Sequence, residues 1–365
     1  MNAPLPIDLS KASPDQSYET VASHFNEVAG LLAQRLRSDT RGDVLFSAAD
    51  RGRYATDASI YQVMPVGVFV PRDEADVRTA LDICRDLGVP IVPRGGGTSQ
   101  CGQTVGVGLV IDHAKHMRKI MAVDAEQRTA TVEPGLVLDH LNAALKTHDL
   151  WYPVDVSTSA QATLGGMAGN NSCGSRSIAY GNMVHNVLGA EAWLADGSLL
   201  EFGAYENAQG RVRQIGDFVR DLALQHASEM DAHWPKVMRR VAGYNLDIFR
   251  NQNERPYTAD GSVNLAHLLI GSEGTLALTR SLTLRLAELP RAKVLGVVNF
   301  PTFYQAMDAA QHIVKLGQGM PVGQLSSLQS PSLVVQFAPK AAFGVSGQRQ
   351  PHGAADHYAE SHCEP

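Results

Sequence analysis

Cysteine is scarce in this chain. Only four of its 365 residues are cysteines, and no two of them form a C-x-x-C pair; they are Cys84, Cys101, Cys173 and Cys363. Disulfide frameworks and zinc or iron–sulfur sites need closely spaced or matched cysteines. We therefore expect neither a disulfide framework nor a metal site from this chain alone.

Long apolar runs and a strong excess of one charge are also lacking. No run approaches the ~20 apolar residues of a membrane span, and the first residues do not combine a basic stretch with an apolar one, as a secretory signal does. We expect no transmembrane segment and a cytoplasmic location. The formal net charge of −6 argues against nucleic acid or an anionic membrane surface as the main partner.

A glycine triplet is present, although two familiar nucleotide-binding motifs are not. In the segment PRGGGTSQCG (93–102), Gln100 stands where G-x-G-x-x-G requires its last glycine, and G-x-x-x-x-G-K-[ST] occurs nowhere. Three successive glycines cost chain entropy and pack nothing. Their presence indicates that another group must approach this backbone closely.

The triplet follows a predicted strand–helix–strand unit. Strands at 66–70 and 89–92 flank a helix with apolar residues at helical spacing, which Asp73 caps and Gly88 ends. Such a unit indicates parallel strands joined by a right-handed crossover. The triplet then lies just beyond the carboxyl end of a strand, where α/β sheets usually bind ligands.

This position favours an anion. Backbone N–H groups in a tight glycine loop form a concave nest, to which Arg94, Thr98 and Ser99 can add hydrogen-bond donors. A phosphate or pyrophosphate fits that description, and the alternative is a mobile surface loop. A second stretch of small and hydroxyl residues at 157–171 suits a flat or extended ligand. Together the two stretches favour one elongated ligand, such as a dinucleotide.

The remaining pattern divides the chain into four parts. Residues 1–60 are expected to form a helical extension, with a helix near 18–37 and a loop at 50–57. Residues 61–289 form the main domain, and 290–316 begin another. The segment 317–365 is rich in Gln, Ser, Pro and Gly and is expected to be a disordered tail. Within the main domain, Asp196-Gly197 predicts a two-residue hairpin.

Five segments in one order carry a family resemblance: PRGGGTSQCG (93–102), TATVEPG (129–135), WYPVDVSTSAQATLGG (151–166), YGNMVHNVLGAEAWLADGSLLEFG (180–203) and GYNLD with LLIGSEGTLALTRSLTLRL (243–247 and 268–286). Together they resemble the FAD-binding domain of the p-cresol methylhydroxylase (PCMH)/vanillyl-alcohol oxidase superfamily. The nearest branch is the FAD-linked dehydrogenases of D-2-hydroxy acids, which includes D-lactate dehydrogenase (cytochrome), the glycolate oxidase D-type subunit and D-2-hydroxyglutarate dehydrogenase. The resemblance covers roughly residues 50–316.

The resemblance implies an α+β fold, with a two-lobed PCMH-type FAD-binding domain at 61–289 followed by a rudimentary cap domain. An extended FAD would lie between the lobes. The residues implied to meet the pyrophosphate are Arg94, Gly95, Gly96, Gly97, Thr98, Ser99, Gly102 and Gln103. Those implied to line the path to the isoalloxazine are Ser157, Thr163, Gly165, Gly166, Asn170 and Ser172. Glu273 and Gly274 would close over the cofactor.

The resemblance also bears on how the flavin is held. Relatives with a covalent histidine place it where this chain has Thr98, and those that add a cysteine place it shortly before the TLGG segment, where this chain has only small and hydroxyl residues. Noncovalent FAD is therefore expected. Cys173 could be a redox thiol, but a small apolar filler is the preferred interpretation. For Glu273 the alternative to a cofactor contact is a turn-capping carboxylate.

The implied activity is oxidation of a small-molecule D-2-hydroxy acid. In that chemistry a base takes the hydroxyl proton, a hydride passes from Cα to flavin N5, and electrons leave to a quinone, a cytochrome or another carrier. The cap-domain segment H-x-G-D-G-N-x-H is absent, so no catalytic residue is assigned and the chain is expected to be truncated after the FAD domain. A sugar-lactone or alcohol oxidase on the same fold and a noncatalytic FAD-binding fragment stay open as alternatives.

Other titratable residues are given structural interpretations. We expect His113 and His116 to lie on the solvated surface rather than bind a metal. His185 is expected to make a structural hydrogen bond rather than contact the flavin ring. Basic residues at 236–240 are expected to form a solvated face.

Overall fold

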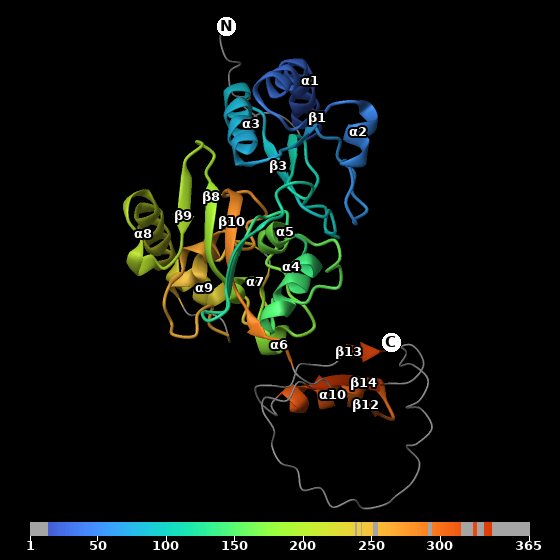
Figure 1. The fold of residues 1–365 in the computed structure, drawn as a ribbon. Helices are drawn as coiled ribbons and strands as arrows, with labels where there is room; N and C mark the ends of the chain where they lie inside the picture. Colours follow the sequence, from blue (N-terminus) through green and yellow to red (C-terminus); the bar gives the residue numbers. More distant parts are fainter. Residues whose placement is uncertain are drawn as a thin grey trace, which may run out of the picture.

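A four-stranded sheet with its helices forms the amino-terminal lobe (Figure 1). The computed structural model describes residues 14–237, 239–241, 243–250, 255–290, 294–314, 324–326 and 332–337. The strand order in this sheet is β1-β2-β4-β3. Its elements are α1 (Pro14–Asp39), β1 (Asp43–Leu45), α2 (Ala48–Arg53), β2 (Gly67–Val70), α3 (Glu74–Leu87), β3 (Ile91–Arg94) and β4 (Leu109–Asp112).

The predicted strand–helix–strand unit is confirmed. The Asp73 side chain accepts a hydrogen bond from the Asp76 N–H at the start of α3, and Gly88 ends the helix in the left-handed conformation with φ 66°. Strands β2 and β3 both pair in parallel with β4, which lies between them. The carboxyl ends of all three strands therefore lie at one edge, where the glycine triplet begins.

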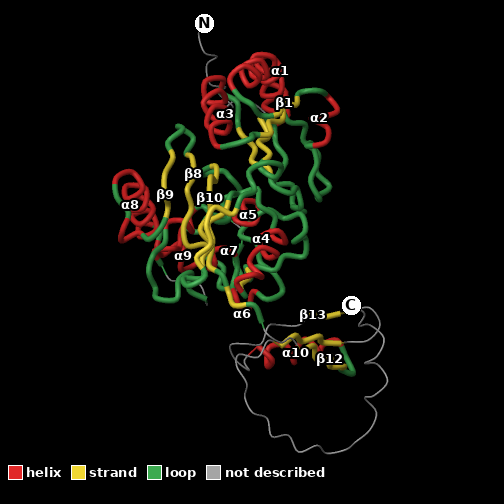
Figure 2. Tube along the Cα trace, in the orientation of Figure 1, coloured by secondary structure: helices red, strands yellow, loops and turns green. Residues whose placement is uncertain are grey.

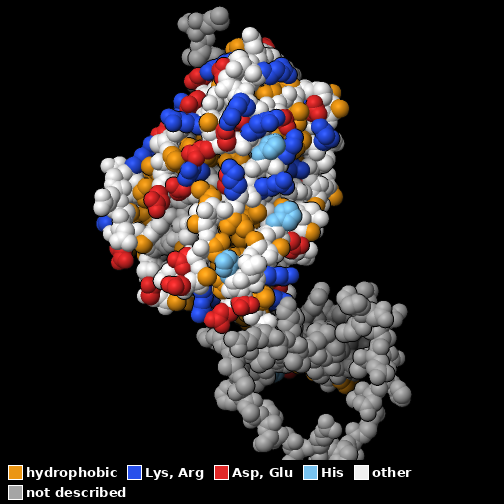
Figure 3. All heavy atoms as spheres, in the orientation of Figure 1, with side chains coloured by type: hydrophobic (Ala, Val, Ile, Leu, Met, Phe, Trp, Pro, Cys, Tyr) orange, Lys and Arg blue, Asp and Glu red, His pale blue; other side chains and the backbone are white. Residues whose placement is uncertain are grey.

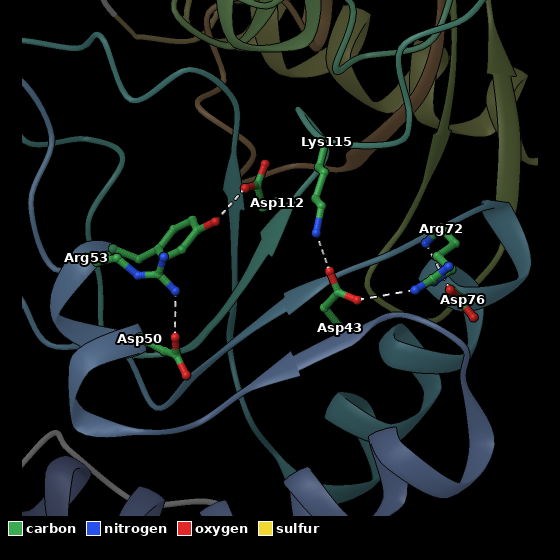
Figure 4. A network of polar contacts seen from close by, with 8 residues as sticks. Asp43, Asp50, Arg53, Arg72, Asp76, Asp112 and Lys115 are labelled. Atoms are coloured by element: carbon green, nitrogen blue, oxygen red, sulfur yellow. Dashed lines mark hydrogen bonds and ion pairs between the residues drawn. The ribbon is translucent and has the colours of Figure 1, made fainter.

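Polar contacts anchor the elements around this sheet (Figure 4). The Asp43 carboxylate on β1 accepts from Lys115 at 2.5 Å and lies 3.5 Å from the Arg72 guanidinium. The buried Asp76 carboxylate accepts from the backbone N–H groups of Arg41 and Arg72, each at 2.9 Å. These bonds fix the start of β1 and the segment after β2 against α3 and the segment after β4.

The second lobe is built on an antiparallel sheet of order β5-β6-β10-β8-β9. Gly197, with φ 84°, lies in the turn between β8 and β9, so the predicted hairpin is confirmed, although residues 194–198 and not two residues alone separate its strands. Figure 2 shows short helices packed around this sheet. The elements are β5 (Ile120–Asp124), β6 (Thr129–Val132), α4 (Leu138–Leu145), β7 (Leu150–Trp151), α5 (Leu164–Gly169), α6 (Ser177–Tyr180), α7 (Met183–Asn186), β8 (Val187–Trp193), β9 (Leu199–Phe202), α8 (Gly210–Gln225), α9 (Ala227–His233), β10 (Leu278–Arg285) and β11 (Ala287–Glu288).

The two lobes share apolar and ionic contacts. Trp193 on β8 and Leu278 on β10 are buried in the core of the amino-terminal lobe, 2% and 6% exposed. Arg280 on β10 forms an ion pair at 2.7 Å with Glu74 on α3. Because the strands of the second sheet reach into the first core, the lobes are held in a defined relation. These contacts therefore fix the positions of the segments that lie between the two lobes.

The last described part contains β12 (Val294–Asn299), α10 (Phe303–Val314), β13 (Gln324–Ser326) and β14 (Ser332–Phe337), with strand order β12-β14-β13. We expected no regular structure in 317–365, yet β13 and β14 lie there. The other residues of 315–365 fall outside the described ranges, as do 1–13 and 291–293. Among the helices of the described residues, none is both long and apolar enough to cross a bilayer.

The prediction of a loop at 50–57 is wrong for residues 50–53, because α2 extends from Ala48 to Arg53. The Ser47 side chain caps this helix by accepting from the Asp50 N–H. Acidic and basic side chains are intermixed over the face shown in Figure 3, and the structure has many ion pairs between exposed side chains, such as Arg85 with Asp82. Such exposed pairs contribute little to the free energy of unfolding.

Candidate cofactor site

A cavity of about 350 Å³ collects nearly all the residues that the sequence singled out. It is lined by the loop after β3, the segment 156–173 with α5, and the turn that precedes β10. The predicted residues on its wall are Arg94, Gly95, Gly96, Gly97, Thr98, Ser99, Gln103, Ser157, Thr163, Gly165, Gly166, Asn170, Ser172, Glu273 and Gly274. Gly102 is not on this wall: its φ is 78°, and a Cβ there would stand 2.6 Å from the Tyr61 ring.

Neighbouring protein atoms leave no room for side chains at the first two positions of the glycine triplet. A Cβ on Gly95 would meet Thr163 Oγ1 and a Cβ on Gly96 would meet the Gln161 carbonyl oxygen, both well inside 3.0 Å. Gly97 has φ 64°, which favours glycine. We expected the ligand to be the group that approaches this backbone closely. The structure shows instead that the second glycine-rich stretch lies directly against the first.

With one side of the triplet against protein, its N–H groups are left for a ligand. Within the described part of the chain, no acceptor pairs with the backbone N–H groups of Gly96, Gly97 or Thr98. Successive unpaired N–H groups in a glycine turn form an anion nest. The loop therefore has the donor set that a pyrophosphate needs.

Arg94 braces this loop from within. Its guanidinium donates to the carbonyl oxygens of Thr56 at 2.8 Å and Thr104 at 3.3 Å, and it lies 5.8 Å from the Tyr54 ring centroid. We expected the guanidinium to contact the ligand phosphate. In the structure its donors connect the start of the loop to Thr104 near the loop's end and to Thr56 in the segment between α2 and β2, and the residue remains on the cavity wall.

The opposite wall is formed by the start of α5. Thr163 caps this helix, since its Oγ1 accepts from the Gly166 N–H at 3.3 Å. Gly165 faces Pro134, where a Cβ would stand 2.6 Å from the proline ring. Beyond the helix, the Ser172 hydroxyl donates to the Asn170 side chain at 2.6 Å. Small residues thus line a wall of backbone and hydroxyl groups.

The turn before β10 closes the cavity from the second lobe. Gln103 Nε2 donates to Glu273 Oε1 at 3.4 Å, and the Glu273 N–H donates to the Gly169 carbonyl oxygen at 2.9 Å. Gly274 packs on Pro93, with φ 75° and no room for a Cβ. Burial raises the pKa of Glu273 to about 7, against a smaller lowering by the Gln103 hydrogen bond. Near neutral pH this carboxyl is therefore partly protonated.

His113 is one of several wall residues that we did not predict. His113 was expected on the solvated surface, but its side chain is only 4% exposed and lines the cavity. The available signal was its place directly after β4, because β3 and β4 are parallel and end at the same edge. Among the described residues, no cluster of His, Cys, Asp or Glu is suited to hold a metal ion.

Of the predictions for the other titratable residues, one is confirmed and one is wrong. His185 Nδ1 accepts from the Asn182 N–H at 3.1 Å, which is the structural role expected. Arg240 is not solvated: it forms a buried ion pair at 2.5 Å with Asp247. Cys173 lines the cavity, and its Sγ is 3.9 Å from an Arg239 guanidinium nitrogen.

These features fit an FAD molecule. The nest could supply N–H donors for a pyrophosphate, the hydroxyls of Thr98, Ser99 and Ser157 could supply partners for sugars, and the prolines and small residues could supply apolar surface. Cofactor sites are concave and mostly apolar, with a few placed polar groups.

Comparisons with known proteins agree with this assignment. Residues 65–203 match a family model described as an FAD binding domain. D-2-hydroxyglutarate dehydrogenase of Pseudomonas putida is 34% identical over 306 residues, which cover 81% of this chain and 30% of that protein. A probable mitochondrial D-lactate dehydrogenase of Danio rerio is 30% identical over 315 residues, covering 85% of this chain and 50% of that protein.

A solved structure shares the fold. Xylooligosaccharide oxidase of Myceliophthora thermophila aligns with a TM-score of 0.59 at 16% identity, covering 85% of this chain and 56% of that one. The chain thus spans about a third to a half of the length of the proteins it resembles. The predicted α+β fold and the resemblance to FAD-linked D-2-hydroxy-acid dehydrogenases are confirmed, and the match of residues 65–203 to an FAD binding domain supports FAD as the cofactor.

Proposed function

We propose that this chain is the FAD-binding part of a dehydrogenase that oxidises a D-2-hydroxy acid of the D-lactate or D-2-hydroxyglutarate class. The observation that carries the proposal is the single cavity between the lobes, which gathers the triplet after β3, the segment around α5 and the turn before β10. The names of the similar dehydrogenases support the substrate class. A quinone or cytochrome-type carrier is the proposed electron acceptor.

The residues of the cavity hold the cofactor in three ways. The N–H groups of Gly96, Gly97 and Thr98 bind the pyrophosphate, while Arg94 keeps their loop in shape. The wall from Ser157 to Ser172 lies along the flavin. Bound FAD supplies the hydride acceptor for the oxidation, and the protein supplies position and electrostatics.

The protonation state of the Glu273 carboxyl favours binding of the negatively charged cofactor. With a pKa of about 7, its carboxyl is largely protonated below neutral pH and does not oppose a nearby phosphate. Its hydrogen bond with Gln103 connects the turn before β10 to the loop after β3. The pair thereby closes the cavity over the cofactor and limits the access of water.

The FAD is proposed to be held without a covalent bond. Thr98 stands in the anion nest, and the Cys173 thiol lies beside the Arg239 guanidinium. Precipitation of the yellow protein with trichloroacetic acid should release all the flavin into the supernatant. Colour that stays in the pellet would contradict noncovalent binding.

The activity is tested by the visible spectrum of the purified protein, recorded without oxygen before and after addition of D-lactate or D-2-hydroxyglutarate. Flavin bands that bleach with one D-acid, and not with its L-enantiomer, support the proposal. Bands that persist leave a noncatalytic FAD-binding module. Rapid formation of hydrogen peroxide in air would favour an alcohol or sugar-lactone oxidase instead.

A further inference from the structure

The segment 54–63, between α2 and β2, lies against the loop after β3. It precedes the part of the chain that matches the FAD binding domain model. The segment folds back on itself, since the Val63 N–H donates to the Ala55 carbonyl oxygen at 2.9 Å. Its Tyr61 ring lies against Gly102, so close that a Cβ there would stand 2.6 Å from the ring. A segment outside the matched domain therefore contacts the loop proposed to bind the pyrophosphate.

Asp57 makes the charged contact between this segment and the loop. One oxygen of its carboxylate accepts from the Thr104 hydroxyl at 2.8 Å, and the other accepts from the Ser59 N–H at 2.8 Å. Partial burial raises the pKa of Asp57, but the hydrogen bonds from Ser59 and Thr104 outweigh it and hold the pKa below its usual value. The carboxyl is therefore ionised near pH 7, and the two bonds hold it in one orientation.

The Thr104 hydroxyl connects Asp57 to Arg94. The Arg94 Nη1 lies 3.4 Å from Thr104 Oγ1 and 3.3 Å from the Thr104 carbonyl oxygen. A guanidinium can only donate, and a hydroxyl has a single proton. That proton goes to the Asp57 carboxylate, so the hydroxyl oxygen accepts from Arg94. The result is a directed chain from guanidinium to hydroxyl to carboxylate, and the bonds of such chains strengthen one another.

The Arg94 guanidinium in turn lies directly against the glycine triplet, because a Cβ on Gly97 would clash with it. Within the described ranges its hydrogen bonds go to Thr56 and Thr104, and no carboxylate pairs with it directly. A displaced guanidinium would move Gly97 and the N–H groups beside it. A loop that already has its bound shape loses less conformational freedom when the ligand binds.

We propose that Asp57 is a positioning residue for FAD, an inference that rests on the proposed function. It acts through the Thr104 hydroxyl and the Arg94 guanidinium, which hold the loop after β3 in the shape that binds the pyrophosphate. Asp57 is not on the cavity wall and does not need to touch the cofactor. The cofactor site thus includes a segment that precedes the matched domain.

A double-mutant cycle tests whether Asp57 acts through Thr104. The FAD-free forms of the wild type, Asp57→Ala, Thr104→Val and the double variant are titrated with FAD. Thr104→Val keeps the shape of the side chain and removes the hydroxyl. Each single variant should weaken FAD binding roughly tenfold, as loss of a hydrogen bond to a charged group does, and the double variant should lose no more than either one. Losses that multiply in the double variant, or wild-type affinity in either single variant, overturn the proposal.

Thr104→Ser and Asp50→Ala complete the set. Thr104→Ser keeps the hydroxyl and should restore most of the affinity that Thr104→Val loses; equal losses would overturn the proposal, even if Asp57→Ala does not fold. Asp50→Ala is the matched control, because Asp50 also accepts from a hydroxyl, that of Ser47 at 2.7 Å, but at the start of α2. This variant should bind FAD as the wild type does.

A comparison of two ligands separates a displaced loop from a general loss of structure. ADP carries a diphosphate, whereas riboflavin carries no phosphate. Asp57→Ala and Thr104→Val should weaken ADP by the same factor as FAD and leave riboflavin binding unchanged. Equal losses for ADP and riboflavin overturn the proposal. Wild-type protein that binds neither FAD nor ADP would instead refute the proposed function, so the two failures are distinguishable.

Discussion

Gln103 and Glu273 meet across the cofactor cavity, with the Gln103 amide nitrogen 3.4 Å from a Glu273 carboxyl oxygen. Gln103 belongs to the loop after β3, and Glu273 belongs to the turn before β10. Glu273 also adopts a left-handed backbone conformation with φ 53°, which is rare for residues other than glycine. The strained turn places a half-buried carboxyl where the two lobes face each other.

This carboxyl predicts a pH dependence of stability. In the unfolded chain Glu273 titrates near its usual pKa of 4.5, whereas in the folded protein its pKa is about 7. Between these values the folded state binds more protons, so the stability that it contributes falls as the pH rises. The melting temperature of the FAD-free protein should therefore drop more from pH 5 to pH 8 in the wild type than in Glu273→Gln. Parallel curves for the two proteins would refute this.

Gly96→Ala should abolish retention of FAD. The added methyl group would stand against the Gln161 carbonyl oxygen, a backbone atom that cannot move aside alone, so the two glycine-rich stretches must separate. The ratio of flavin to protein absorbance after purification measures the effect. Gly52→Ala is the control, because a Cβ at Gly52 in α2 meets nothing within 4 Å. A Gly96→Ala protein that purifies with full flavin would contradict the assigned nest.

Arg94→Lys should weaken FAD binding by roughly tenfold or more. A lysine cannot donate to the Thr56 and Thr104 carbonyl oxygens with one planar fork, so the loop loses its brace. Titration with FAD, followed by quenching of flavin fluorescence, gives the affinity. Arg53→Lys, at an exposed ion pair with Asp50, should leave it unchanged. Equal affinities for Arg94→Lys and wild type would show that the brace is dispensable.

Arg240→Met should destabilise the protein by about 3–5 kcal/mol. Asp247 is 1% exposed and also accepts from the Tyr257 hydroxyl, and loss of its guanidinium partner leaves a buried negative charge without its cation. The double variant Arg240→Met/Asp247→Asn should recover part of this loss, because no net charge then remains buried. Urea denaturation gives both free energies of unfolding. A single variant as stable as the wild type would contradict the buried pair.

The local sequence was sufficient to predict the helix caps, the turns and the helix that depend on residues close together in the chain. The cap at Asp73, the stop at Gly88 and the turn at Gly197 follow from the conformations that these residue types favour. The helix from Glu74 to Leu87 follows from apolar residues at helical spacing. Each of these depends on neighbours within a few positions, so pattern and propensity were sufficient.

The candidate site was predicted in part. The sequence singled out two glycine-rich stretches and the turn around Glu273, and the cavity contains all three. It could not show that the stretches press against each other, because the contact between Gly96 and Gln161 joins residues far apart in the chain. Their lack of side chains was visible, but the atoms that require it were not.

Burial and charge pairing were decided by tertiary structure alone. His113 resembles a surface residue in its local sequence, yet the parallel pairing of β3 with β4 brings it beside the glycine triplet. Arg240 reads as part of a basic face, yet Asp247 neutralises it in the interior. Solvent exposure depends on which distant segments cover a residue. The sequence by itself determined the elements with local signals and pointed to the cofactor, whereas only the packing of the two lobes decided which polar groups line the cavity.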